Sequence, residues 1–141
     1  MIEALLARIR DTVPEIKFLG EMADFQRAVE SNPVAVPALF VIEGDESASP
    51  SQFSDVVVSQ RVRATVGLVL VVRNLSDANG EAAKSELRQL RQLVKAQVFG
   101  WQATAEFDPF ERGQSHLLAF RDGHVWWQDQ YLTSFYDRSV L

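Results

Sequence analysis

The apolar run VVVSQRVRATVGLVLVV, at residues 56–72, limits the folds open to this chain more than any other feature. As one β-strand, at about 3.3 Å per residue, it would reach roughly 55 Å, which is longer than a domain of this size normally spans. The odd positions from Ser59 to Thr65 are polar, whereas both faces turn apolar beyond Gly67. We therefore expect a central strand in the second half and one leg of a protruding β-hairpin arm in the first. Gly67 would be the bulge or bend between them.

A polar, acidic segment, EGDESASPSQFSD at residues 43–55, separates this run from a second apolar strand, PALFVIEG. Only Phe53 interrupts its polar character. Clusters of Ser, Asp, Gly and Pro between apolar runs indicate loops. The segment is therefore predicted to be the loop at the tip of the arm.

Helical spacing of apolar residues predicts two longer helices. Residues 2–12 form a short amphipathic helix stopped by Pro14, and the second helix follows a cap at Asp77 or Asn79 and stops at Gly100. The apolar stripe of the second helix consists of Ala83, Leu87, Leu90, Val94 and Val98. Its basic residues, Lys84, Arg88, Arg91 and Lys95, are interleaved with acids and glutamines, which favours a solvated face over a phosphate-binding stripe.

Shorter patterns complete the expected fold. EIKFLGEM predicts a short edge strand, and ADFQRAVES predicts one or two helical turns. The order helix, strands, helix, strands favours an α+β fold, in which two helices pack on one face of a mainly antiparallel sheet with a long hairpin arm. The 141 residues, 47% of them hydrophobic, are typical of a single domain spanning 1–141.

A hairpin is predicted at the C-terminal end, because Asp122-Gly123 suits a two-residue type I′ turn. Counting back from this turn places Leu118 opposite Trp127 and His116 opposite Asp129. Neighbouring Trp126 and Trp127 must point to opposite faces of the strand, so one of them leaves the main core. We expect that side chain, assigned to Trp126, to be covered by another subunit.

Catalytic chemistry has one weak candidate, His116 beside Asp129, because a carboxylate can orient an imidazole that acts as a general base. Ser115 is next in sequence but points to the other face of the strand, so it is badly placed as a nucleophile. A structural cross-strand pair is the favoured interpretation. Without cysteine and with two histidines, no metal-ligand spacing is present, and no cofactor motif occurs.

Charge and hydropathy exclude other classes. A net charge of −5 argues against nucleic-acid recognition, no window is long and apolar enough for a membrane span, and the N-terminus lacks the apolar core of a signal peptide. We therefore expect a protein that stays soluble in the cytoplasm or in something assembled there.

The order of elements resembles the tail terminator, or tail completion, proteins of long-tailed bacteriophages and their prophages, closest to the contractile-tailed branch. The resemblance rests on four stretches, IEALLARIRDTV, PALFVIEGDESASPSQFSDVVVSQRVRATVGLVLVVRN, AAKSELRQLRQLVKAQVFGW and HLLAFRDGHVWWQDQYLTSFYD. It covers nearly the whole chain.

The resemblance implies a structural role without enzyme activity or cofactor. Proteins of this family are soluble monomers that form a hexameric ring on the last ring of the tail tube, at the head-proximal end of the virion tail, after assembly in the host cytoplasm. Their expected partners are the tail tube protein and the head-tail connector or neck protein. Other tail, neck or tube-like subunits of similar fold, or a small adaptor unrelated to phage, are the alternatives.

The resemblance also gives the polar segment a role. In the family, the loop at the hairpin tip is flexible in the free subunit and becomes ordered against neighbours in the ring. Residues 43–55 would form this flexible tip, with Phe53 as an apolar anchor. Its acids, Asp45, Glu46 and Asp55, would face Arg61 and Arg63 of the adjacent subunit.

Overall fold

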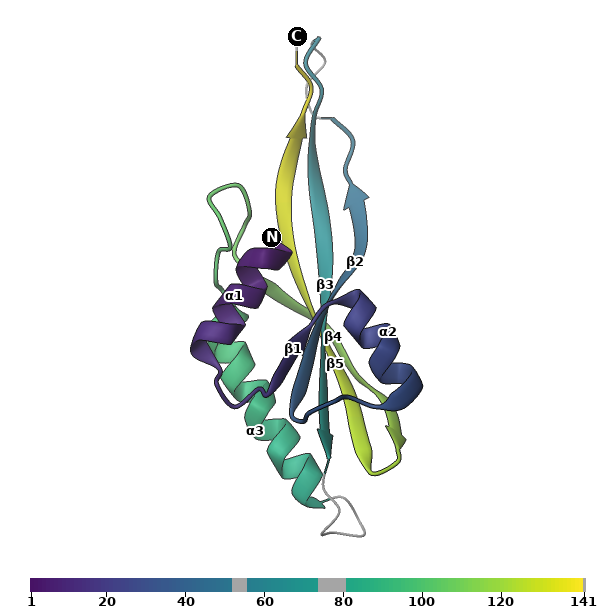
Figure 1. The fold of residues 1–141 in the computed structure, drawn as a ribbon. Helices are drawn as coiled ribbons and strands as arrows, with labels where there is room; N and C mark the ends of the chain where they lie inside the picture. Colours follow the sequence, from purple (N-terminus) through teal and green to yellow (C-terminus); the bar gives the residue numbers. More distant parts are fainter. Residues whose placement is uncertain (52–55, 74–80, 141) are drawn as a thin grey trace.

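A computed structural model describes residues 1–51, 56–73 and 81–140 of the chain. These residues form helices on both faces of a five-stranded sheet with the strand order β1-β2-β3-β5-β4 (Figure 1). The helices are α1 (Ile2–Thr12), α2 (Met22–Ser31) and α3 (Glu81–Val98). The strands are β1 (Phe18–Gly20), β2 (Ala38–Ala48), β3 (Ser59–Arg73), β4 (Glu111–Arg121) and β5 (His124–Arg138). Only the β1–β2 pairing is parallel, so the predicted α+β class is confirmed.

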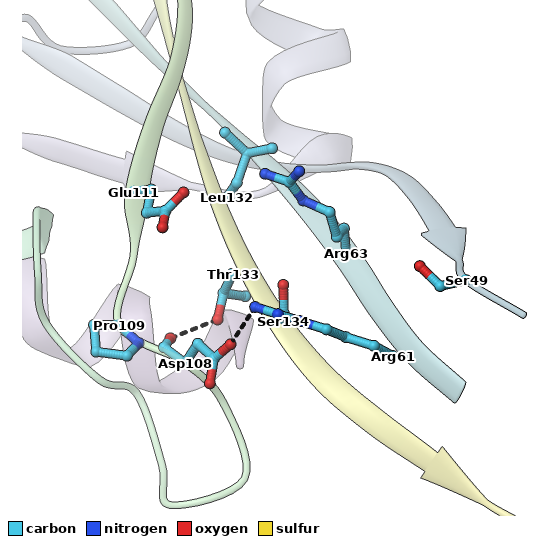
Figure 2. Close-up of a pocket in the computed structure, with 9 residues that line it drawn as sticks. All are labelled: Ser49, Arg61, Arg63, Asp108, Pro109, Glu111, Leu132, Thr133 and Ser134. Carbon is cyan, nitrogen blue, oxygen red and sulfur yellow. Dashed lines mark hydrogen bonds and ion pairs between the residues drawn. The ribbon is translucent and has the colours of Figure 1, made fainter. Parts of the chain in front are cut away.

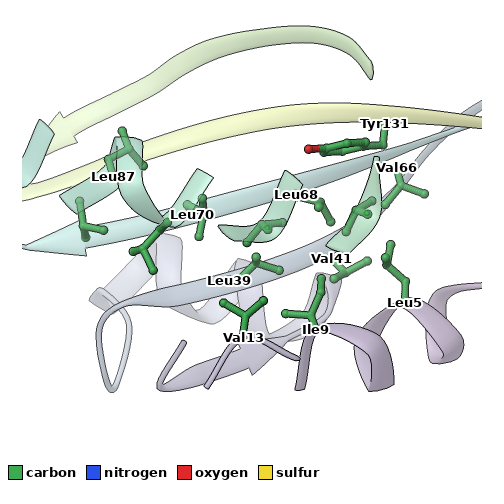
Figure 3. Close-up of a cluster of buried hydrophobic side chains, with 14 of the residues drawn as sticks. Leu5, Ile9, Val13, Leu39, Val41, Val66, Leu68, Leu70, Leu87 and Tyr131 are labelled. Atoms are coloured by element: carbon green, nitrogen blue, oxygen red, sulfur yellow. The ribbon is translucent and has the colours of Figure 1, made fainter. Parts of the chain in front are cut away.

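The main core lies between the sheet and the layer formed by α1 and α3 (Figure 3). Leu5 and Ile9 of α1 meet the strand residues Leu39, Leu68 and Leu70 there, and all five are at most 1% exposed. The entire predicted apolar stripe of α3 is also buried in this core. The chain turns at Gly100 with φ +78°, a conformation that glycine adopts without strain, so the predicted stop is confirmed. Asp77 and Asn79, the predicted caps, lie outside the described residues.

α2 covers the other face of the sheet (Figure 1). A smaller core lies between α2 and this face. Phe40 and Trp126 both pack against Phe25 of α2, with ring centroids 5.7 and 6.1 Å apart respectively. The prediction that two helices pack on one face of the sheet is therefore correct for α1 and α3. It did not include α2, which packs on the other face. Trp126 is 3% exposed, so the cover that the sequence assigned to another subunit comes from a helix of the same chain.

β3 contains the long run that was expected to bend, and it pairs with β5 without any register shift from Ser59 to Arg73. The prediction of a bulge at Gly67 is therefore wrong. The irregularity lies on β2, between Glu43 and Glu46. At Gly44 a Cβ atom would collide with the Thr65 hydroxyl, and that hydroxyl donates a hydrogen bond to the carbonyl of Asp45 at 2.9 Å. Glycine is thus needed because β3 approaches the backbone closely.

The C-terminal hairpin turns at Asp122 and Gly123, whose φ values of 51° and 72° fit the predicted type I′ turn. The predicted pairs closest to the turn are confirmed, including Ala119 opposite Trp126. A register shift at Leu118 then places Leu117, not Leu118, opposite Trp127.

The shift also changes the partners of the residues that lie beyond Leu118, counted from the turn. His116 lies opposite Gln128, and Ser115 takes the place opposite Asp129 that was assigned to His116. The predicted His116–Asp129 pair is therefore wrong, because counting from the turn assumed a ladder without a bulge.

Part of the sheet projects beyond the helices and is called the extension here (Figure 1). It consists of Glu43–Ala48, Ser59–Arg63 and Ser134–Arg138, the ends of β2, β3 and β5. The sequence predicted a two-stranded hairpin arm, but β5 pairs along the whole first part of β3, which makes the extension three-stranded. Glu43–Ala48 of the predicted loop belong to β2.

Candidate subunit-contact surface

Charged side chains of the extension are sorted between its two faces. Glu46 lies directly opposite Ala64, whereas Arg63 lies opposite Ser47. Paired residues share a face and successive residues alternate, so Glu46 and Arg63 lie on opposite faces of the extension. By the same alternation Arg61 shares the face of Arg63. Opposite charges on opposite faces are what a head-to-tail contact between identical subunits requires.

The basic face borders a cavity of about 290 Å³ (Figure 2). Its lining consists of Ser49, Arg61, Arg63, Asp108, Pro109, Glu111, Leu132, Thr133 and Ser134. Asp108 is held by its backbone, because its N–H donates to the Ser134 carbonyl at 2.9 Å and its carbonyl accepts from the Thr133 hydroxyl at 2.6 Å. The cavity therefore has a fixed acidic wall beside the two arginines.

Arg61 forms an ion pair with Asp108 inside the same subunit, at 2.8 Å (Figure 2). The two side chains are 53% and 54% exposed, so water screens the attraction and the pair is easily exchanged for another partner. The side chain of Arg63 makes no hydrogen bond or ion pair with any other described residue. Arg61 and Arg63 are the two predicted basic contacts. Arg61 is therefore already paired within its own subunit, whereas the Arg63 side chain is available to another subunit.

Of the acidic residues predicted to contact another subunit, the structure describes Asp45 and Glu46. The side chains of Asp45 and Glu46 are exposed, and the Asp45 carbonyl belongs to the bulge held by Thr65. Phe53 and Asp55 lie outside the described residues.

Apolar side chains lie next to the charges at the end of the extension. Val56 is 80% exposed, Val58 is 46% exposed and Tyr136 is 54% exposed, with the Arg138 guanidinium 5.1 Å from the Tyr136 ring centroid. Exposed apolar groups surrounded by polar ones are typical of protein-binding surfaces. The sequence interpretation missed this group, because Val56 and Val58 were counted as part of one long strand.

Asp129, the carboxylate predicted to pair with His116, instead binds Arg91 of α3. Arg91 donates to both carboxylate oxygens, at 2.9 and 2.8 Å, and the Trp127 indole N–H donates to one of them at 3.1 Å. The Arg91 guanidinium also lies over the Trp127 ring, 4.5 Å from its centroid. The arrangement clamps α3 onto β5.

Burial alone would raise the pKa of Asp129, but hydrogen bonds from Arg91, Ser115 and Trp127 and the charge of Arg91 outweigh it and lower the pKa below its ordinary value. A carboxylate that is ionised and fully hydrogen-bonded is suited to structure, not to general base catalysis. Arg91 was predicted to lie on a solvated face. Its position four residues after Leu87, beside the apolar stripe, was the signal that it faces the sheet.

The described part of the chain contains no group of three or more His, Asp or Glu residues that could hold a metal ion. Within the same residues, every helix is too short or too polar to cross a membrane.

The sequence matches the family model for the phage tail terminator protein over residues 1–139. This chain belongs to the phage tail terminator family. The match covers nearly its whole length, which agrees with the resemblance seen in the order of its elements. No curated protein matches the chain.

Membership of the tail terminator family assigns the protein to phage tail assembly. The family is one of structural proteins, so this chain is a structural component of the virion tail that works with other tail components.

Proposed function

We propose that this protein caps the phage tail tube as a hexameric ring, stops tail polymerisation and provides the surface on which the head-side connector joins. The observation that carries the proposal is the tail terminator match over residues 1–139, which takes in both cores and the extension. The ring would lie at the head-proximal end of the tail, between the tube protein and the neck.

The extension supplies the contacts between subunits in this proposal. A closed ring of identical subunits has a heterologous interface, in which one surface meets a different one on the next copy. Glu46 lies on one face of the extension and Arg61 and Arg63 lie on the other, so each set can meet an oppositely charged surface of a neighbouring copy. Asp45, in the bulge of β2, belongs with Glu46 in the acidic set. Phe53 and Asp55 belong to the same proposed contact through their place in the sequence.

The proposal is tested by size-exclusion chromatography coupled to light scattering over a concentration and salt series, with negative-stain imaging of any large species. We expect a monomer that becomes a ring of six at high concentration or when tail tubes are added. Added to polymerising tube protein, it should shorten the tubes and be visible at one end only. Tubes that grow to the same length with and without the protein would contradict the proposal.

A deletion of residues 48–54 ties ring formation to the extension. The shortened chain should keep the helical circular dichroism of the intact monomer, because residues 48–51, the described part of the deleted segment, lie outside both cores. It should nevertheless form no rings. A control variant, Asp11→Ala with Glu30→Ala, changes two exposed residues outside the extension and should assemble normally. Rings from the deleted chain would remove the extension from the proposed interface.

A further inference from the structure

A basic cleft lies between α3 and the β4–β5 pair, on the face of the main core. Its lining consists of Arg88, Arg91, Gln92, Lys95, Arg112, Asp129 and Tyr131, and its volume is about 200 Å³. Four of these side chains are cationic and one is a carboxylate, in a chain whose net charge is −5. The cleft therefore concentrates positive charge on an acidic protein.

The carboxylate of the cleft is already neutralised. Asp129 takes both hydrogen bonds from Arg91, and the nearest nitrogen of Arg112 is 4.0 Å away. Arg112 donates to the Ser115 hydroxyl at 3.0 Å, and Lys95 lies 5.7 Å from the Phe99 ring centroid. With Arg88, these residues leave positive charge in the cleft that no described carboxylate of the subunit offsets.

One neutral donor also lines the cleft. The Tyr131 hydroxyl makes no hydrogen bond to another described residue. Burial, together with the charge of Asp129, raises the pKa of Tyr131 to about 12, so the hydroxyl keeps its proton at neutral pH. Cationic groups beside a neutral donor form a site for a carboxylate.

Unpaired acids lie on the opposite edge of the same sheet. β1 covers β2 only as far as Phe40, so the rest of β2 is an edge among the described strands. Glu43, Asp45 and Glu46 are exposed on this edge, and none of them has an ion pair with a described residue. The edge therefore presents three carboxylates without a counter-charge.

The acidic edge and the basic cleft lie at the same level of the sheet. Glu43 pairs with Val66, Val66 with Tyr131 and Tyr131 with Arg112, which forms one row across the four strands. Three strand spacings separate its ends, about 14 Å. Paired residues share a face, so Glu43 points to the same face of the sheet as the cleft. A contact between the two ends on successive copies would add no shift along the strands, which suits a ring whose axis runs along them.

We infer that the acidic edge of β2 in one copy binds in the α3–β4–β5 cleft of the next copy. This inference rests on the proposed ring and names the surface that closes it. Within the extension, Arg61 is engaged by Asp108 and Arg138 donates to the Ser59 hydroxyl, which leaves Arg63 without a described partner. The cleft, in contrast, offers Arg88, Lys95 and Arg112 together. The cleft, not the arginines of the extension, is therefore the counterpart of Glu43 and Glu46.

Cross-linking tests the contact directly, because the chain has no native cysteine. The double variant Glu43→Cys with Arg112→Cys, assembled and treated with a short bis-maleimide, should give a ladder of covalent multimers that ends at the closed ring. Each single variant should remain monomeric on a denaturing gel. The matched control, Glu43→Cys with Arg63→Cys, should give no ladder.

Charge reversal provides an independent test. Lys95→Glu with Arg112→Glu should abolish rings, and so should Glu43→Arg with Glu46→Arg, while circular dichroism of each monomer stays unchanged. The chain that carries all four substitutions should recover rings, because the contact is then restored with opposite sign. Recovery would not occur if the residues merely supported folding.

The outcomes separate this inference from the proposed function. If the wild-type chain forms rings, a ladder from the variant Glu43→Cys with Arg63→Cys, or no effect of the reversals, would overturn the cleft contact and leave the ring intact. Failure of the wild-type chain to form rings with or without tubes would overturn the proposed function and the contact together.

Discussion

The two halves of β3 show how one strand serves two purposes. From Leu68 to Val72 it is buried on both faces, between the α1–α3 layer and α2. From Ser59 to Arg63 it extends beyond the helices (Figure 1). The arginines of this half are exposed. The ladder to β5 is the same in both halves, so backbone pairing does not distinguish them.

The difference lies in what covers the strand. The covered half derives stability from apolar burial, whereas the extension keeps polar and apolar groups exposed for a partner. A folded core can thus carry a surface whose side chains contribute little to the stability of the free subunit. The substitutions below test this division, from the largest expected effect to the smallest.

Leu70→Ala should have the largest effect, because it removes a buried side chain between β3 and the α1–α3 layer. We expect a loss of about 3 kcal/mol in the free energy of unfolding and a fall in Tm of roughly 10 °C. Urea denaturation and calorimetry measure both values. Val58→Ala, at a half-exposed site beside the extension, should change stability by less than about 0.5 kcal/mol. Equal losses of stability at the two sites would contradict the division between a stabilising core and an exposed extension.

Asp129→Asn should have the next largest effect, because it leaves Arg91 without its buried counter-charge. At neutral pH we expect a loss of about 2 kcal/mol, which is moderated because the Arg91 side chain is 27% exposed.

The pH dependence of this loss has a definite sign. Folding lowers the pKa of Asp129 below its ordinary 3.8, so its contribution is complete at neutral pH and disappears as the pH falls below about 4. Urea denaturation should show the wild type and the variant converging in acid. A constant difference from neutral to acid pH would contradict the role of the ion pair.

Gly44→Ala tests the bulge where β2 enters the extension. The added methyl group would collide with the Thr65 hydroxyl, so we expect a loss of about 1 kcal/mol. Placing the same change in a Thr65→Ala background removes the obstacle, and the loss there should be smaller. Equal losses in both backgrounds would show that steric contact with Thr65 is not the reason for glycine.

Glu43→Ala with Glu46→Ala should have the smallest effect on the free subunit. Both side chains are exposed, so the free energy of unfolding should change by less than about 0.5 kcal/mol. Ring formation, measured by light scattering, should nevertheless be lost. A stability loss as large as that of Leu70→Ala would mean that the extension belongs to the folding core.

Local patterns in the sequence were sufficient for much of the fold. The stripe from Ala83 to Val98 predicted the buried face of α3, and Asp122-Gly123 predicted the hairpin turn, because both depend on residues close in sequence. These signals also led to the correct α+β class.

Long-range features could not be read in the same way. The bulge at Leu118 has no signature in the alternation of polar and apolar residues, so the pairing of His116 was miscounted. The Arg91–Asp129 pair joins residues 38 positions apart, which no local pattern reports. The row from Glu43 to Arg112 likewise can be recognised only once the strand order is known.

Hydrogen exchange with mass spectrometry, on the free subunit and on rings bound to tail tubes, tests the central claim most directly. We predict that residues 43–48 exchange quickly in the free subunit and become protected in the ring, while residues 68–72 are protected in both states. Protection of residues 43–48 that is the same in both states would contradict the account, because the extension would then not be a surface that assembly covers.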